Sequence, residues 1–243
     1  MTGARNSCMR PYLELFRVSN IPTVLTNVAT AWLLSAAVPV WQRSQSSRGL
    51  AAGLAVVCLY FAGMGLNDVL DVEQDRARRA DRPVPSGRLS LAKAWTATVG
   101  AFAAAMGLLA TLGLQPFAAG AALMALIVGY DVSHKRWAAS VWLMGLCRGM
   151  VYVVLGAALA SQLTVPLLVA AVGQTLYVVG ITVAARWEKT GRIRWRVPMP
   201  WLIAGIALVD GLLAAVFVRP GWILLGLAGM GLTVYGQRMV RGD

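Results

Sequence analysis

Hydrophobic and polar positions follow one another in long blocks along this chain. Apolar, nearly uncharged runs repeatedly approach or exceed the length of about 20 residues that a helix needs to cross a bilayer. Most charged residues gather between these runs. The pattern predicts eight membrane-spanning helices, at residues 18–40, 49–66, 94–114, 117–130, 137–161, 164–185, 198–218 and 221–236. Residues 94–130 carry no charge and are too long for one span, so we expect Gln115-Pro116 to form a turn between two.

The composition and the distribution of charge agree with this pattern. Hydrophobic residues make up 58% of the chain and charged residues 13%, which is typical of an integral membrane protein. We therefore expect an all-α fold in one integral membrane domain, residues 1–243. If the N-terminus is cytoplasmic, all but four of the 22 Lys and Arg residues lie on the cytoplasmic side or at its span ends, the exceptions being Arg43, Arg48, Arg148 and Arg219.

This asymmetry explains the net charge of +12 by membrane orientation rather than by nucleic-acid binding. We expect a lipid bilayer as the surroundings of the chain and no nucleic-acid partner. The predicted location is the cell membrane, crossed several times, with both termini and the main polar loops in the cytoplasm.

One polar stretch, residues 67–90, contains five of the ten acidic residues. If the preceding apolar run continues as a helix, Asn67, Asp71 and Asp75 are spaced by four residues and Asp68 precedes Asp71 by three, so all four share one helical face. Carboxylate and amide oxygens of this kind suit Mg²⁺, which uses one or two protein carboxylates and leaves positions for substrate phosphate. Five nearby arginines, among them Arg82, favour a phosphate-bearing substrate. The alternative is a solvated helix end whose acids are balanced by these arginines.

The sequence order NDxxDxxxD at 67–75 and RPxPSGxxS at 82–90 resembles the UbiA-type (4-hydroxybenzoate polyprenyltransferase-like) superfamily of intramembrane prenyltransferases. Weaker parts of the resemblance are Arg17-Val18-Ser19-Asn20 with Asn27, the loop 130–136 and Arg148-Gly149. The resemblance extends from about residue 10 to residue 188. It implies a helical bundle around a central cavity open to the cytoplasmic side. In such a cavity, Mg²⁺ and basic residues hold a prenyl diphosphate, and an acceptor attacks the allylic cation left when diphosphate departs.

Carried onto this chain, the resemblance assigns the metal site to Asn67, Asp68, Asp71 and Asp75. The residues expected to contact substrate are Asn27, Arg82, Lys135, Arg136, Arg148 and Arg186. Catalytic roles are expected for Asp68, Asp71, Asp75, Lys135 and Arg186.

Two features depart from the family pattern. Members usually carry a second aspartate-rich motif at the end of the sixth span, but residues 173–189 read GQTLYVVGITVAARWEK, without aspartate. Either Arg186, with Lys189, replaces the second metal as a fixed positive charge against diphosphate, or catalysis has been lost or changed and Arg186 only anchors the helix end. The family also commonly has nine spans, where this chain predicts eight.

Two further charges, Arg148 and Asp210, fall inside predicted spans, where each costs about 2.5–3.5 kcal/mol on insertion scales. We expect them to pair across the fifth and seventh spans; the alternative is that they line the cavity. Taken together, the residues predict a Mg²⁺-dependent prenyltransferase with a prenyl diphosphate donor and an acceptor of unknown identity, an aromatic compound being one candidate. The main alternative is a catalytically silent relative that binds or transports an isoprenoid or polar lipid.

Overall fold

The structure is a computed structural model that describes residues 3–35, 43–134, 137–160, 163–191 and 198–240. These residues form helices and contain no strand, which confirms the predicted all-α fold class. Two short 3-10 helices, η1 (Val18–Asn20) and η2 (Pro220–Trp222), accompany the α-helices. The α-helices are α1 (Gly3–Leu15), α2 (Ile21–Ser35), α3 (Arg43–Leu70), α4 (Val72–Arg78), α5 (Leu91–Leu112), α6 (Leu114–Ser133), α7 (Ser140–Leu159), α8 (Val165–Lys189), α9 (Met199–Phe217) and α10 (Ile223–Met239).

Six of these helices, namely α3 and α5 to α9, are long and apolar enough to cross a membrane. The first and last predicted spans correspond to α2, of which 15 residues are described, and to α10, which has 17. The predicted number of eight spans therefore stays a prediction, while the position of each long helix agrees with the hydrophobic pattern.

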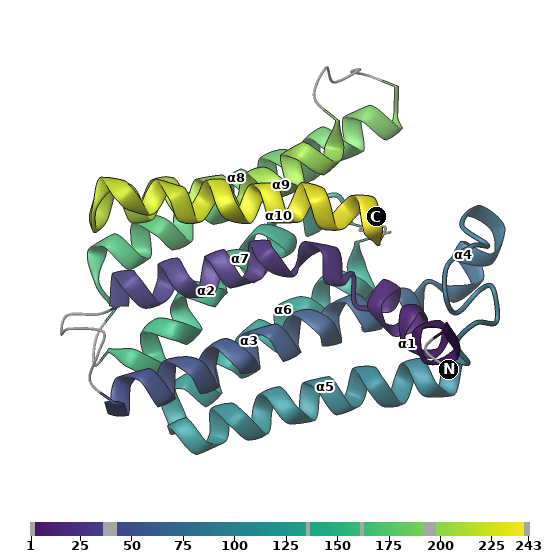
Figure 1. Cartoon of the computed structure of the whole chain (residues 1–243), viewed down its shortest axis with the longest axis horizontal. Helices are drawn as coiled ribbons and strands as arrows, with labels where there is room; N and C mark the ends of the chain where they lie inside the picture. Colours follow the sequence, from purple (N-terminus) through teal and green to yellow (C-terminus); the bar gives the residue numbers. More distant parts are fainter. Residues whose placement is uncertain (1–2, 36–42, 135–136, 161–162, 192–197, 241–243) are drawn as a thin grey trace.

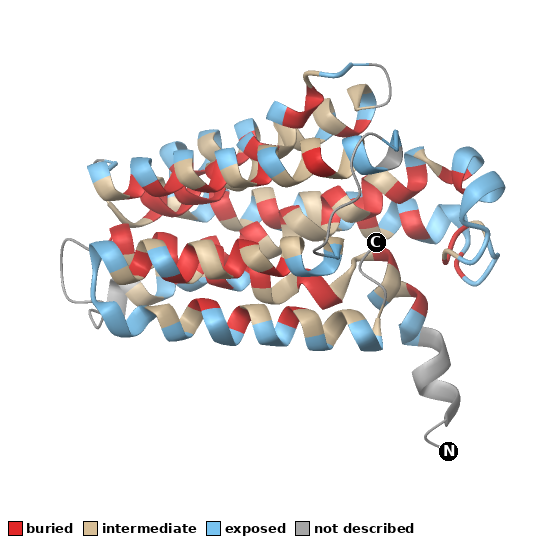
Figure 2. Ribbon diagram, turned by 90° about the horizontal axis from the view of Figure 1, so that it is seen from above, coloured by how far each residue is buried: buried red, intermediate tan, exposed pale blue. Residues whose placement is uncertain are grey.

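The long helices lie side by side in a bundle (Figure 1). The helices α1 and α4 and the C-terminal end of α10 lie at one end of it, which we call the motif end. Helix α2 is central, because it packs against α3, α7, α9 and α10. Buried and exposed residues alternate along the ribbon of the long helices (Figure 2). This pattern is expected of helices that have neighbouring helices on one side and lipid on the other.

Small residues let several helices approach closely. A Cβ atom on Gly211 of α9 would lie only 2.6 Å from the Cα atom of Gly226 of α10. A Cβ atom on Gly149 of α7 would lie 2.9 Å from the carbonyl oxygen of Ala171 of α8. Helix association in lipid relies on such close packing, since lipid tails are as apolar as the side chains.

The turn between α5 and α6 differs from the prediction. It lies at Gly113, whose φ of 115° is accessible to glycine and strained for other residues. Helix α6 begins at Leu114, so Pro116 lies in its first turn. Proline is tolerated there because the first backbone N–H groups of a helix have no partner within the helix. Gln115-Pro116 therefore starts the next helix, and the preceding glycine makes the turn.

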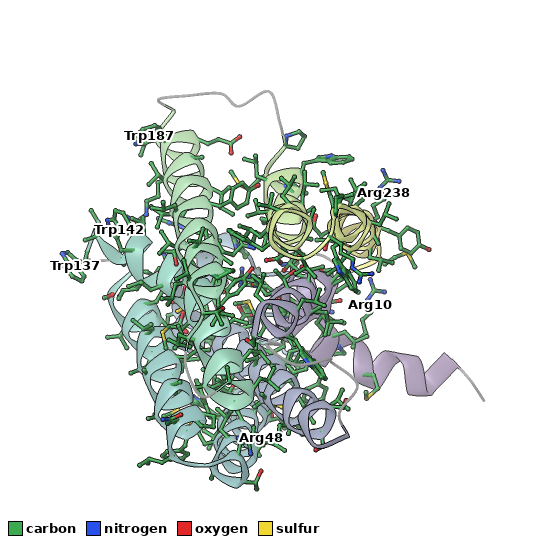
Figure 3. All side chains as sticks on the ribbon, turned by 90° about the vertical axis from the view of Figure 1, so that its left-hand side faces the viewer. Arg10, Arg48, Trp137, Trp142, Trp187 and Arg238 are labelled. Carbon is green, nitrogen blue, oxygen red and sulfur yellow. The ribbon has the colours of Figure 1, made fainter. Side chains whose placement is uncertain are left out.

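Arg48 of α3 joins three helices at the end of the bundle opposite the motif end (Figure 3). Its guanidinium donates to the carbonyl oxygens of Leu112 and Ala158, at 2.9 and 2.8 Å. These carbonyls belong to the last turns of α5 and α7, where helix carbonyls lack intrahelical partners and attract positive charge.

The helix that carries the acidic stretch is interrupted at Asp71. Helix α3 ends at Leu70, and Asp71, with φ −96° and ψ 3°, precedes the short helix α4. The backbone N–H of Asp71 still donates to the carbonyl of Asn67, and that of Asp75 to Asp71. The chain thus changes direction without losing its hydrogen bonds, and the helix expected to continue through residue 75 is interrupted at Asp71.

Candidate functional site

A cavity of about 170 Å³ lies inside the bundle between α2, α3, α6 and α7. Most of its wall is apolar, for example Val24, Leu59 and Leu123. Toward the motif end its wall becomes polar, and we call this polar rim the mouth of the cavity: Arg17, Asn67, Tyr130 and Asp131. An apolar space therefore ends at charged and amide side chains.

Asn67 connects two charged groups at the mouth. Its side-chain oxygen accepts a hydrogen bond from Arg17 Nη2 at 3.2 Å, and its amide nitrogen donates to Asp131 Oδ1 at 3.3 Å. The second oxygen of Asp131, Oδ2, is buried and has no hydrogen-bond partner among the described residues. Asp131 was not predicted as a site residue; α6 brings it to Asn67 from 64 positions away.

Asp68 and Asp75 form ion pairs with arginine instead of facing the cavity. Asp68 Oδ1 accepts from Arg17 and from Arg82, both at 3.1 Å, and Asp75 Oδ2 accepts from Arg82 at 2.6 Å. We call Arg17, Arg82, Asp68 and Asp75 the mouth cluster. Both carboxylates are buried. Two of the four predicted metal ligands are therefore paired with guanidinium groups, and the metal-binding role of all four stays a prediction.

Arg17 has an unusual backbone for a residue with a side chain. It lies between α1 and η1 with φ 45° and ψ 53°, in the left-handed region. The hydroxyl of Tyr60 donates to its carbonyl oxygen at 2.9 Å. This bond and the contacts of the guanidinium hold Arg17 where it borders the cavity. The sequence offered it only as part of the Arg17-Val18-Ser19-Asn20 resemblance.

A cleft of about 690 Å³ opens at the motif end above the cavity mouth, and we call it the acidic-motif cleft. Asn67, Asp71 and Asp75 line it, together with arginines of α4 and the loop that follows. His134 lies on its wall, stacked on Tyr130, with Nε2 3.7 Å from Asp71 Oδ2. The His134 Nδ1 atom faces the carbonyl oxygens of Tyr130 and Asp131, so Nδ1 carries a proton and donates to them.

The oxygens around the mouth fit Mg²⁺. Among the described residues, no three His, Cys, Asp or Glu side chains are grouped closely enough to enclose a metal. Mg²⁺ does not need such a cage, because it typically uses one or two carboxylates and completes its shell with water and phosphate. Asn67, Asp71 and Asp131 carry hard oxygen atoms that line the cavity or the acidic-motif cleft, and Asp131 Oδ2 accepts no hydrogen bond from the described residues.

Comparison with known proteins agrees with this geometry. The model of the UbiA prenyltransferase family matches residues 23–240. The chain belongs to the UbiA prenyltransferase family. The resemblance inferred from the acidic motif is therefore confirmed, and the protein is an integral membrane protein like other members of the UbiA family.

Individual relatives match parts of the chain. A digeranylgeranylglyceryl phosphate synthase from Metallosphaera sedula is 30% identical over 128 residues, which is 53% of this chain and 44% of the relative. A solved structure of a digeranylgeranylglyceryl phosphate synthase has a TM-score of 0.64 at 17% identity and covers 96% of this chain and 87% of its own. A UbiA homologue from Archaeoglobus fulgidus bound to GPP and Mg²⁺ has a TM-score of 0.57 at 13% identity, covering 94% and 86%. The chain thus spans less than half the length of that first curated relative, and the two structures support the fold.

Arg186 occupies the helix end where the UbiA family usually has its second motif. Its guanidinium donates to the carbonyl of Ala138 at 2.6 Å, to Ser140 Oγ at 2.8 Å and to the carbonyl of His134 at 3.5 Å. These partners belong to the connection between α6 and α7, and Arg186 lines neither the cavity nor the acidic-motif cleft. Its predicted contact with diphosphate stays a prediction. Lys135 and Arg136 lie outside the described residues.

Arg148 and Asp210 are connected through a third residue rather than paired directly. Arg148 Nη1 donates to Asn27 Oδ1 at 3.0 Å, and Asn27 Nδ2 donates to Asp210 Oδ1 at 2.7 Å. Asp210 also accepts from Thr26, Tyr152 and Gln174. We call these residues the inner cluster. The expectation of a direct pair is corrected, because neutral donors surround Asp210; Arg148 in addition lines the cavity, as the alternative predicted.

Proposed function

We propose that this protein is a Mg²⁺-dependent membrane prenyltransferase that moves a prenyl group from a prenyl diphosphate to an acceptor. One observation carries the proposal: the apolar cavity ends at a mouth of carboxylate, amide and guanidinium groups, which opens on the acidic-motif cleft. A prenyl diphosphate has the same division into an apolar chain and a polyanionic head. Membership of the UbiA family supports the assignment.

The cavity would hold the prenyl chain, and its apolar wall would keep water from the allylic cation that forms when the bond between carbon and diphosphate breaks. Tyr60 and Tyr130 are the two aromatic residues among those that line the cavity. The acceptor then supplies the electron pair for the new bond and afterwards loses a proton.

Asn67, Asp71 and Asp131 would hold Mg²⁺. When bound, the metal supplies positive charge that stabilises the departing diphosphate. A UbiA homologue bound to GPP and Mg²⁺ supports this choice of donor and metal. Arg17 and Arg82 border the acidic-motif cleft, so they would bind diphosphate there. Lys135 and Arg136, predicted from the sequence, would take part in this binding.

We also propose that the motif end faces the cytoplasm. The positive-inside rule supports it, since all but four of the 22 basic residues fall, by sequence, in the segments that the predicted spans assign to the cytoplasmic side when the N-terminus is cytoplasmic. A second function, binding or transport of an isoprenoid without chemistry, is favoured by one observation. Helix α8 presents Arg186, bonded to loop carbonyls, where a second group of carboxylates is usual in the family.

The test is diphosphate release from geranyl diphosphate by the purified protein in detergent, with and without Mg²⁺, with a panel of aromatic acceptors. We expect Mg²⁺-dependent release in wild type and a loss of at least about 100-fold in Asp71→Ala. Asp81→Ala is the control, because Asp81 lies at the same end but outside the acidic-motif cleft. If the protein binds geranyl diphosphate but releases no diphosphate from it, the result would favour the catalytically silent binding protein.

A further inference from the structure

A second cleft, of about 600 Å³, lies at the motif end between α1, the α4 region and the end of α10. Seven arginines line it against three acidic residues. We call it the basic cleft; its charged residues are Arg10, Glu14, Arg17, Asp68, Arg78, Arg79, Asp81, Arg82, Arg88 and Arg238. The excess of positive charge indicates an anionic ligand.

The basic cleft is distinct from the acidic-motif cleft. Four arginines border both clefts: Arg17, Arg78, Arg79 and Arg82. Two of them, Arg17 and Arg82, form ion pairs with Asp68, which lines only the basic cleft of the two. Arg10 and Arg238 border only the basic cleft. They come from opposite ends of the chain, on α1 and α10, and Figure 3 shows them on the same side of the bundle.

Part of the positive charge in the basic cleft is not balanced. Glu14 accepts from Arg10 at 3.1 Å and from Arg88 at 2.7 Å, so these two cations share one carboxylate. No carboxylate in the described part of the chain forms an ion pair with Arg78, Arg79 or Arg238. Guanidinium groups bind phosphate oxygens through two parallel N–H donors, which makes a phosphate the best-matched anion.

Apolar residues border the same cleft. Met239 lines it and is 65% exposed, and Val240 lines it beside Met239. A soluble phosphate would gain nothing from these side chains, whereas the acyl chains of a lipid would cover them. We propose that the basic cleft binds the phosphate headgroup of an anionic phospholipid, separately from the donor diphosphate.

The experiment measures binding to the full chain in detergent by isothermal titration calorimetry, with dihexanoyl phosphatidate, dihexanoyl phosphatidylcholine and inorganic phosphate as probes. The variant Arg10→Ala/Arg238→Ala removes two cations from the basic cleft. The control Arg76→Ala/Arg219→Ala removes the same charge from outside it: Arg76 pairs with Glu73 on the surface of α4, and Arg219 follows α9.

We expect saturable binding of phosphatidate to wild type, weaker by at least about tenfold in the basic-cleft variant and changed less than about twofold in the control. Phosphatidylcholine and inorganic phosphate should bind at least about tenfold more weakly than phosphatidate. Equal weakening in both variants, or none in the basic-cleft variant, would overturn the site. Inorganic phosphate binding as tightly as phosphatidate would overturn the lipid and identify free phosphate as the ligand.

A parallel titration with geranyl diphosphate and Mg²⁺ separates this site from the proposed reaction. The basic-cleft variant should bind geranyl diphosphate as wild type does, because Arg10 and Arg238 do not border the acidic-motif cleft. Loss of both ligands in this variant would show that the two clefts are one site and would overturn the proposal. Wild type that binds phosphatidate but not geranyl diphosphate would leave the lipid site standing and count against the proposed function.

Discussion

The mouth cluster and the inner cluster use the same residue types in different surroundings. In the mouth cluster, Arg17 and Arg82 contact carboxylates directly and border open clefts. In the inner cluster, Asn27 stands between Arg148 and Asp210, and Asp210 is fully buried. The difference indicates that the mouth cluster can exchange partners with a ligand, whereas the inner cluster has a fixed set of partners.

The physical reason is the cost of removing charge from water. A buried ion is tolerated only when hydrogen bonds satisfy its remaining atoms. The carboxylate oxygens of Asp210, on α9, accept hydrogen bonds from side chains of α2, α7 and α8. These hydrogen bonds therefore connect four helices. We therefore expect substitutions in the inner cluster to affect folding and those at the mouth to affect activity.

The largest expected effect is on stability, in Asp210→Ala. This change leaves four donors without their acceptor and removes the carboxylate that Asn27 connects to Arg148, and we expect a loss of about 3–5 kcal/mol in the free energy of unfolding. Unfolding in detergent followed by circular dichroism measures it. The control is Glu73→Ala, which removes an exposed carboxylate paired with Arg76 and should cost less than about 1 kcal/mol. Equal stability of the two variants would contradict the distinction between the clusters.

The next effect is on activity, in Asp131→Asn. The change keeps the size of the side chain and removes one negative oxygen ligand from the mouth, so diphosphate release from geranyl diphosphate should fall by about 100-fold. The melting temperature should stay near that of wild type, because Asp131 has an oxygen without a partner among the described residues. Asp81→Asn, a carboxylate of the basic cleft, serves as the control. A wild-type release rate in Asp131→Asn would remove this residue from the site.

The sequence predicted most of the helices because membrane spans are long apolar runs. It singled out Asn67, Asp71 and Asp75 because they follow the end of such a run, and all three line the acidic-motif cleft, while their metal-binding role stays a prediction. It did not predict Asp131, because a single aspartate after a span looks like any other span end. Only the packing of α6 against α3 shows that it faces Asn67.

The sequence did not predict the ion-pair partners of two acids in the motif. Helical spacing grouped Asp68 and Asp75 with Asn67, but it did not show that both acids pair with Arg82. Arg82 is only seven positions from Asp75, yet its direction depends on the loop that follows α4. Spacing within a helix is readable from sequence, whereas the path of a chain after the helix depends on tertiary contacts.

Arg186 shows a third environment for an arginine, different from those of the mouth cluster and the inner cluster. Its bonds to the connection between α6 and α7 predict that Arg186→Ala loses about 1–2 kcal/mol in the free energy of unfolding. Diphosphate release should fall less than in Asp131→Asn, because the connection carries His134 but Arg186 does not border the cleft. Arg186→Lys is the control for charge alone. A variant with wild-type stability and no release would instead support direct contact with diphosphate.

The smallest expected effect concerns Glu14, which forms ion pairs with Arg10 and Arg88 at the basic cleft. The hydrogen bond from Arg88, with a smaller contribution from Arg10, lowers the pKa of Glu14 below its ordinary value, although partial burial opposes this. A carboxylate whose pKa is lowered by folding stabilises the fold above its unfolded pKa of about 4.3 and loses this contribution as the pH falls through the folded pKa.

Wild type should therefore melt at a higher temperature than Glu14→Gln near neutral pH. The difference should shrink once the pH falls below about 4.3 and vanish below the lowered pKa. Melting temperatures of both proteins in detergent across this range measure it. A difference that stays constant down to low pH would mean that the two arginines hold α1 by packing rather than by charge. The contacts of Glu14 with Arg10 and Arg88 would then stabilise the fold by packing, unlike the charge pairs of the mouth cluster.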